Sequence, residues 1–374
     1  MSKKIHKIVL TGGPAGGKTT LTTKIIKDFS EKGYRVIIVP ETATDLISGF
    51  GIKPFGNCIE MIPFQEFVFD YQLKKEELAI KAAEMVPEDN VIILYDRGIF
   101  DNMAYVGEEE FEKLLKKFNL SYENAFSRYD AVLHMVSSAV GAAQFYNLDN
   151  AARTENVEQA AILDKKTMNC WIGHPHMRII DNSTNFERKL EKAMSEIYSV
   201  LGEPVPMEIE RKFLIEMPDI NLLIEKYNAV ASNIVQTYLI SNKDGFERRI
   251  RQRGKNGDFS YSYTEKKALS GLERIEIERP LTQNEYLDLM TEAAPGYHQI
   301  LKTRYCFVYN SQYFELDIYT FNNENAILEI ELTHKPDDKS KILVPPEIKI
   351  IREVTEESAY KNYSLALNGG FPKS

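Results

Sequence analysis

The feature that most constrains this chain is the stretch GGPAGGKT, which runs from Gly12 to Thr19. It follows a short apolar run, Ile8 to Leu10, and precedes an amphipathic helical pattern that begins near Lys18. A glycine-rich turn between a strand and a helix can direct backbone N–H groups at a phosphate, and the helix dipole favours the same anion. An ordinary glycine-rich turn is the alternative, but the strand, the helix and the Lys-Thr ending together favour a phosphate-binding loop.

The residue types in this loop have separate tasks. The ammonium group of Lys18 is suited to the terminal phosphates, and the hydroxyl of Thr19 is suited to magnesium. We therefore predict nucleotide or phosphate contacts from Gly12, Gly13, Gly16, Gly17, Lys18, Thr19 and Thr20.

The first half of the chain, residues 1–203, alternates between short apolar runs and helix-length segments. Strand candidates lie at 36–39, 91–94, 131–135 and 177–180, in addition to the run before the loop. This alternation predicts an α/β domain in which helices cover both faces of a parallel sheet.

Acidic residues end two of these strands, at the sheet edge that carries the phosphate loop. Asp96, in VIILYDRG, is predicted to orient magnesium, with Arg97 available for phosphate charge. Glu41, in VIIVPETATD, and Asp101 are alternative residues for orienting or deprotonating an acceptor hydroxyl, and the sequence does not choose between them. A helix cap or a surface ion pair is the structural alternative for each acid.

Arg153, in NAARTENVEQAAILDKK, lies where a mobile lid over the phosphates is expected. A lid arginine neutralises charge in the transition state, but a plain surface helix fits the same residues. His174 is interpreted as a turn residue beside Pro175, and Trp171 as a core residue.

Residues 5–200 resemble small P-loop kinase domains such as the ribosylnicotinamide kinase part of the NadR proteins, which are related to deoxynucleoside kinases. The resemblance rests on TGGPAGGKTT, VPETA, YDRGIFDNMAY and HPHMRIIDNS. It implies that Gly17, Lys18, Thr19 and Asp96 bind a magnesium nucleotide. It also implies that Arg153 belongs to a lid and that Asn182 lies near the base.

The sequence pattern changes after LGEPVPM, where Gly202, Pro204 and Pro206 interrupt regular structure. From about 205 to 372, runs with a period of two follow one another with turn signals between them, among them Asn256-Gly257. We count about eight strands, near residues 207, 234, 246, 259, 272, 300, 312 and 326. This half is predicted to be an α+β domain built on an antiparallel sheet.

Charged residues occupy every second position on most of these strands, with apolar residues between them. The alternating positions are Glu208, Glu210 and Lys212; Glu247, Arg249, Arg251 and Arg253; Thr264 and Lys266; Arg274, Glu276 and Glu278; Lys302 and Arg304; Glu315 and Asp317; and Glu329 and Glu331.

One interpretation is a sheet whose charges face water. The strand number and the sorting of acidic from basic pairs favour instead an eight-stranded antiparallel barrel with the charges inside, forming a tunnel. INLLIEKYNAV, TQNEYLDLMTEAA and TEESAYKNYSLAL are the helices available to cover the apolar outside. Such a tunnel suits a polyanion bridged by divalent metal, because carboxylates bind hard cations and guanidinium groups bind phosphate.

Glu208-Ile-Glu210-Arg-Lys212 is similar to the E-x-E-x-K signature of CYTH domains, the triphosphate tunnel metalloenzymes, and the similarity runs from about 205 to 370. This resemblance implies that the acidic pairs hold metal, that Lys212 serves catalysis, and that the basic residues bind triphosphate. The implied phosphate contacts are Arg249, Arg251, Lys266, Arg274, Lys302 and Arg304. The candidate metal ligands of both halves are Thr19, Asp96, Glu208, Glu210, Glu276, Glu278, Asp317, Glu329 and Glu331.

The composition of the whole chain limits the ligands and the cellular compartment that we expect. A net charge of −9 argues against general nucleic-acid binding. Cys58, Cys170 and Cys306 form no disulfide or zinc pattern, which favours a reducing, cytoplasmic location. No segment is long and apolar enough for a membrane span.

These observations predict two phosphate sites, with Mg²⁺ or Mn²⁺ and ATP or GTP as cofactors. The leading hypothesis is a metal-dependent triphosphatase fused to a P-loop kinase or NTPase. The rival is a non-catalytic GTP-binding switch, since the tandem order also resembles the translocation-defect family of animal photoreceptors. In that case the tunnel captures a phosphorylated ligand such as a phosphoinositide. Adenylyl cyclase activity is a third and weaker hypothesis.

Overall fold

The computed structural model describes residues 3–56, 58–141, 156–202, 209–241, 246–268, 274–332 and 342–372. Within the strands, the side chains of 209, 267, 268, 274–277, 331 and 332 are not described. The chain forms two compact units, Met1–Pro204 and Val205–Ser374, and each is described by itself.

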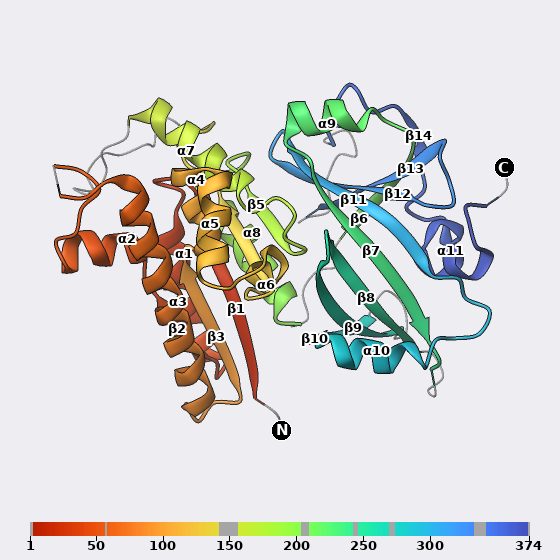
Figure 1. Ribbon diagram of the computed structural model, residues 1–374, viewed down its shortest axis with the longest axis horizontal. Coiled ribbons are helices and arrows are strands. Elements are labelled where there is room, and N and C mark those ends of the chain that lie inside the picture. The colour runs from red at the N-terminus through yellow and green to blue at the C-terminus, as the bar shows by residue number, and fades with distance from the viewer. Residues whose placement is uncertain are drawn as a thin grey trace. The chain divides into compact units, whose positions relative to one another are not determined.

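The first unit contains the predicted parallel sheet, with the strand order β2-β3-β1-β4-β5 (Figure 1). All four strand pairs are parallel. The strands are β1 (Lys4–Thr11), β2 (Arg35–Val39), β3 (Asn90–Asp96), β4 (Ala131–Met135) and β5 (Met177–Ile180).

Helices cover both faces of this sheet, which confirms the predicted fold class. The helices α1 (Lys18–Glu31) and α8 (Phe186–Val200) pack Leu21, Ile25 and Ile197 on one face, against a core that includes Ile8 and Leu10. The remaining helices are α2 (Thr42–Thr44), α3 (Met61–Met85), α4 (Met103–Val106), α5 (Glu108–Lys117), α6 (Tyr122–Phe126) and α7 (Val157–Asn169). A π-helical turn, Asp45–Gly49, and a 3₁₀ turn, Ile99–Asn102, complete the unit.

Trp171 lies in the core of the first unit, as the sequence predicted. It is fully buried, and its ring centroid lies 5.1 Å from that of Phe100 and 5.4 Å from that of Tyr129. His174 is also fully buried, and its Nε2 atom lies 3.1 Å from the carbonyl oxygen of Tyr129. These contacts agree with a structural role for both residues.

The second unit contains an antiparallel sheet of nine strands, ordered β10-β9-β8-β7-β11-β12-β13-β6-β14. The strands are β6 (Ile209–Glu216), β7 (Val230–Leu239), β8 (Phe246–Lys255), β9 (Asp258–Ala268), β10 (Arg274–Leu281), β11 (Ile300–Tyr309), β12 (Gln312–Tyr319), β13 (Asn325–Leu332) and β14 (Ile350–Glu353). This arrangement agrees with the predicted tunnel-like domain.

The ninth strand, β14, was not predicted. It pairs with β6 through an irregular register between Ile350 and Arg352, and all four of its residues are exposed. A short exposed strand with a bulge lacks the alternation that identifies strands in a sequence. Among the described residues the sheet order ends at β10 and β14, which do not pair with each other.

Three helices lie against this sheet, as predicted: α9 (Ile220–Tyr227), α10 (Gln283–Met290) and α11 (Asn362–Asn368). The helix α9 contributes Leu223 to an apolar cluster with Phe213, Ile215, Phe307 and Phe314. Since Phe213 flanks Lys212 on β6, this cluster lies on the face opposite the alternating charges. The helix α10 contributes Tyr286 to a second cluster, with Leu239 and Ile250.

The helix α11 differs from the expectation, because it does not cover the outer face. Its Leu365 and Ala366 pack with Leu214, Tyr319 and Ile327. Leu214 shares the face of Lys212, two residues away, and pairs with Ile327 in the strand register. The charged side of the sheet therefore becomes apolar toward one end, and α11 packs there.

Removing the side chain of Leu365 tests this packing. Leu365 is fully buried, so Leu365→Ala is expected to destabilise the second unit by about 2–5 kcal/mol. Leu367→Ala, in the same helix at a side chain 50% exposed, is the matched control with little expected effect. Urea unfolding followed by circular dichroism measures the loss. The fluorescence of Trp171, the only tryptophan, reports the first unit and should not change. Equal stability of the two variants would contradict this packing.

Candidate functional site

At two positions in the glycine-rich loop, only glycine fits. Gly12 has φ 126°, and a Cβ there would lie 2.2 Å from the carbonyl oxygen of Met135. A Cβ at Gly16 would lie 2.4 Å from the same oxygen. The loop therefore lies directly against the end of β4. Gly17, with φ 93°, caps α1, and Thr19 and Thr20 are exposed on its first turn.

Lys18 points back onto its own loop. Its Nζ atom donates hydrogen bonds to the carbonyl oxygens of Gly12 and Gly13, both at 3.1 Å. Burial and the nearby Arg97 guanidinium lower the pKa of Lys18, although Asp96, Glu41 and Asp101 oppose this shift. An anionic phosphate at the loop would stabilise the charged ammonium.

Asp96 lies at the end of β3, as predicted. Its Oδ1 atom is buried and has no hydrogen-bond partner among the described residues. Burial and the Glu41 carboxylate raise the pKa of Asp96. A buried carboxylate oxygen without a partner fits a divalent cation, which magnesium sites commonly bind through one or two carboxylates plus phosphate oxygens. Asp96 and Thr19 are therefore suited to hold magnesium here.

Arg97 has a strained backbone, with φ 70°, and pairs with two acids. Its Nε atom donates to Glu41 at 2.6 Å, and its Nη1 atom lies 3.4 Å from Asp101 Oδ1. Asp101 also accepts hydrogen bonds from Thr11 Oγ1 and, at 2.9 Å, from the Gly98 backbone N–H. Asp101 is thus buried and bonded on both oxygens, whereas the Glu41 side chain is 32% exposed.

The described site residues that were predicted in the first unit lie close together. Arg153 lies outside the described residues. Asn182, predicted near the base, donates its amide hydrogens to the carbonyl oxygens of Ser137 and Val140, at 2.8 and 2.7 Å. Its amide is therefore engaged with the turn that follows β4.

Sequence reasoning missed two buried residues beside the loop. Asp164 on α7 accepts hydrogen bonds from the backbone N–H groups of Gly13 and Ser137, at 2.7 and 3.0 Å. Lys189 on α8 donates to the Val136 carbonyl oxygen at 2.6 Å, and its burial lowers its pKa to about 8. Neither residue belongs to a motif, so no signal in the sequence marks them.

The second candidate site is the charged face of the nine-stranded sheet, which we define by the charged residues of β6, β8, β11, β12 and β13 that share one side. Directly opposed residues on antiparallel strands share a side. The register opposes Lys212 to Glu329, Glu315 to Glu329, and Arg304 to Asp317. The period of two along each strand thus aligns the predicted charges across four neighbouring strands.

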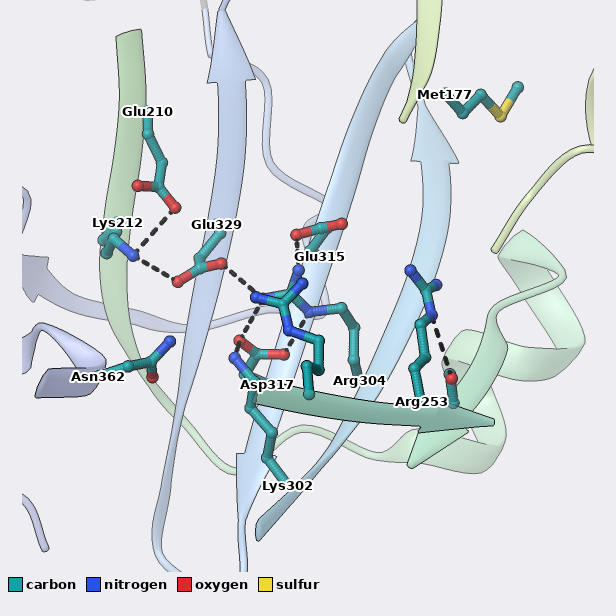
Figure 2. A network of polar contacts seen from close by, with 12 residues as sticks. Met177, Glu210, Lys212, Arg253, Lys302, Arg304, Glu315, Asp317, Glu329 and Asn362 are labelled. Carbon is teal, nitrogen blue, oxygen red and sulfur yellow. Dashed lines mark hydrogen bonds and ion pairs between the residues drawn. The ribbon is translucent and has the colours of Figure 1, made fainter. Parts of the chain in front are cut away.

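A chain of alternating charges crosses these strands, as Figure 2 shows. Lys212 lies between Glu210 and Glu329, with Nζ–Oε distances of 2.9 and 2.7 Å. Arg304 donates to Glu329 at 2.7 Å, to Asp317 at 2.6 and 2.7 Å, and to Glu315. Lys302 also pairs with Asp317. The chain therefore neutralises most of the charge on this part of the face.

The two carboxylates beside Lys212 differ in their electrostatics. Partial burial and the Glu329 carboxylate raise the pKa of Glu210, whose side chain is 41% exposed. Glu329 is buried, but Lys212 and Arg304 hold the pKa of Glu329 far below its usual range. The Lys212 ammonium group already lies between these two carboxylates, so a divalent metal held by Glu210 and Glu329 would have to take over its place.

Among the side chains that the structure describes, no three His, Cys, Asp or Glu residues form a group able to hold a metal ion. Three predicted metal ligands and one predicted phosphate contact are not described. Glu208 lies outside the described residues, and the side chains of Glu276, Glu331 and Arg274 are not described. In the backbone register, Glu331 pairs with Glu210 and Glu276 pairs with Lys266. Asp317, a predicted metal ligand, is fully buried between Lys302 and Arg304. Glu278 is exposed at the end strand β10.

Arg251, the middle residue of the basic row Arg249, Arg251 and Arg253 on β8, differs from the cations of the neutralised chain. The Nε atom of Arg251 is buried without a hydrogen-bond partner in the described part of the chain, and its Nη2 atom lies 3.4 Å from Gln236 Oε1. Burial and the neighbouring guanidinium groups lower the pKa of Arg251 to about 10. A desolvated cation among other cations is a place where an anion would be stabilised.

Comparison with known proteins supports the class of domain to which the first site belongs. Residues 7–189 match the family model described as AAA domain. The first unit therefore contains an AAA-like P-loop domain, the class of domain that its loop and sheet define. No curated protein matches the chain.

Among solved structures, the chain is similar to NE1496, described in one structure as a hypothetical protein and in another as an inorganic triphosphatase. The identity is 30% in both cases, the match covers 44% of this chain and 100% or 96% of NE1496, and the TM-score is 0.32. The protein PH1012 from Pyrococcus horikoshii OT3 is 22% identical, over 33% of this chain and 78% of its own, with a TM-score of 0.25. No described helix has the length and apolar character needed to cross a membrane.

The Glu41–Arg97 pair predicts a pH dependence for the first unit. Although burial opposes it, Arg97 lowers the pKa of Glu41 from 4.5 to about 2. Ionised Glu41 thus stabilises the fold above about pH 4.5, and this contribution is lost as the pH falls toward 2. Glu41→Gln should therefore reduce the fall in melting temperature over this range, measured by Trp171 fluorescence. Glu31→Gln, at an exposed position on α1, is the control and should melt as the parent does. Identical profiles for both variants would contradict the pairing.

Proposed function

We propose that the second unit hydrolyses a triphosphate with the help of a divalent metal, and that the first unit binds Mg-ATP or Mg-GTP as a kinase or NTPase. The nucleoside, inorganic and thiamine triphosphates are the substrate candidates. The observation that carries the triphosphatase proposal is the row Arg249, Arg251 and Arg253 on the same face as the acidic pair Glu210 and Glu329.

The charge distribution suits a polyanion with bound metal. Arg304 and Lys302 already pair with Asp317, whereas the buried Nε atom of Arg251 would gain a partner from a phosphate oxygen. Its unused Nε–H is the donor for that contact. Magnesium or manganese, held by Glu210 and Glu329, would neutralise phosphate charge and lower the pKa of a bound water. Lys212 pairs with both carboxylates in the structure, and its ammonium group would move toward the phosphate when the metal binds.

In the first unit, Lys18 is the residue expected to move on nucleotide binding. Among the described residues, its ammonium group donates only to the carbonyl oxygens of its own loop, so it is positioned to turn toward the terminal phosphates. Thr19 and Asp96 are the proposed holders of magnesium. Arg97 is paired with Glu41 and Asp101, and we propose that this cluster orients the phosphoryl acceptor.

The triphosphatase proposal is tested by two substitutions on the charged face. Glu210→Gln removes a proposed metal ligand and Arg251→Gln removes a proposed phosphate contact. Each should lower the rate of phosphate release at least about tenfold, the effect of losing about 1.5–3 kcal/mol from a charged contact. The substrates are tripolyphosphate, ATP, GTP and thiamine triphosphate, each with Mg²⁺ or Mn²⁺.

The control for both is Arg211→Gln, because Arg211 lies on the opposite side of β6 and pairs with Glu353 at 2.6 Å. Unchanged rates in Glu210→Gln would overturn the proposal. No turnover of any substrate by the parent, together with binding to phosphoinositide vesicles that Arg251→Gln abolishes, would instead support the switch protein.

Nucleotide binding by the first unit is tested by Lys18→Ala. The loss of the ammonium group should weaken binding of Mg-ATP or Mg-GTP at least about tenfold in calorimetry. Lys24→Ala is the control, since Lys24 forms a surface ion pair with Asp28 on the same helix, at 3.3 Å. Triphosphate hydrolysis by the second unit should persist in Lys18→Ala. Unaltered nucleotide affinity would refute the role of Lys18.

A further inference from the structure

The helix α7 contacts the phosphate loop through one buried carboxylate. Asp164 is 3% exposed, and its Oδ1 atom accepts hydrogen bonds from the backbone N–H groups of Gly13, at 2.7 Å, and Ser137, at 3.0 Å. Its Oδ2 atom lies 3.4 Å from Nε2 of His134, which is fully buried in β4. Asp164 therefore joins α7, the end of β4 and the phosphate loop at a single point.

Both backbone polar groups of Gly13 form hydrogen bonds to side chains. Asp164 accepts from its N–H, and the ammonium group of Lys18 donates to its carbonyl oxygen at 3.1 Å. A Cβ at Gly13 would lie 2.8 Å from both Cβ and Oδ1 of Asp164, so the close approach requires glycine. The orientation of this residue thus links the position of Asp164 to the resting position of Lys18.

The carboxylate is present in its charged form. Burial alone would raise the pKa of Asp164, but His134 and the N–H groups of Gly13 and Ser137 lower it below its ordinary value. A charged acceptor makes stronger hydrogen bonds to backbone N–H groups than a neutral one does. The two bonds are therefore suited to hold the loop in one conformation.

We propose that Asp164 is a positioning residue for the nucleotide site, which fixes the Gly13 backbone and so pre-orders the phosphate loop and Lys18 before nucleotide binds. The proposal rests on the proposed binding of Mg-ATP or Mg-GTP by the first unit. Without the carboxylate, the loop must be ordered during binding, and that cost reduces affinity. Asp164 acts through the loop and does not itself contact the nucleotide.

The test compares two substitutions at this position in the full chain. Asp164→Ala removes the acceptor and should raise the Kd for Mg-ATP or Mg-GTP at least about tenfold, the loss of roughly 1.4 kcal/mol or more. Asp164→Asn keeps an oxygen that accepts both N–H groups, and should remain within about threefold of the parent. Calorimetry measures both. Hydrogen exchange of the loop peptide without nucleotide should be faster in Asp164→Ala and close to the parent in Asp164→Asn.

Asp130→Ala is the matched control. Asp130 also accepts a hydrogen bond from a backbone N–H on β1, that of Lys7 at 2.7 Å, but near the middle of the strand and away from the loop. It should lower the melting temperature followed by Trp171 fluorescence without changing nucleotide affinity. If Asp164→Ala does not fold, Asp164→Ser replaces it, because its hydroxyl oxygen lies nearer the backbone than Oδ1 does and cannot accept from both N–H groups.

Parent-like affinity and exchange in Asp164→Ala would overturn the proposal, as would an equal loss of affinity in Asp130→Ala. The proposal about Asp164 and the proposed nucleotide binding of the first unit can be refuted independently. If the parent binds neither nucleotide, the proposed function of the first unit falls. The exchange measurement then still decides whether Asp164 orders the loop, since it uses no nucleotide.

Discussion

Both units depend on charged side chains that are buried away from water and only partly paired with opposite charges. In the first unit, the buried Oδ1 atom of Asp96 and the partly buried ammonium group of Lys18 both lie at the carboxyl edge of the parallel sheet. In the second, the Nε atom of Arg251 is buried among other guanidinium groups. Such groups cost stability in the free protein and gain from a ligand of opposite charge. The fold surrounds each with a packed framework that keeps it in place.

The surrounding pairs explain why these sites are stable enough to exist. Arg97 is compensated by Glu41 and Asp101, and Arg304 by three carboxylates. The compensation is uneven, because acids are concentrated on β12 and β13 and guanidinium groups on β8. The unevenness separates a part of the charged face suited to metal from a part suited to phosphate. Cross-strand register produces this separation, since each strand presents its own alternating residues to the same side.

The position of the loop from Gly12 to Thr19 between β1 and α1, and that of Asp96 at the end of β3, agree with the sequence pattern, because a glycine pattern between a strand and a helix has few other structures. The nine-stranded sheet was predicted in all but β14, which is short and bulged. The packing of α11 was placed on the wrong side of its sheet. Its amphipathic pattern shows that one face is buried, but it does not show which side of the sheet buries it.

By itself, the sequence determined the class of both units and the face on which each charged strand residue lies, because the helical and strand periods are local properties. Only the tertiary structure decided which charges are paired and which remain without partners. Gly13 and Asp164 are 151 positions apart, and Arg304 and Glu329 are 25 apart. Contacts at such separations arise from packing and strand register, and no spacing along the chain encodes them. For that reason Asp164 emerged as a contact of the phosphate loop only in the folded chain.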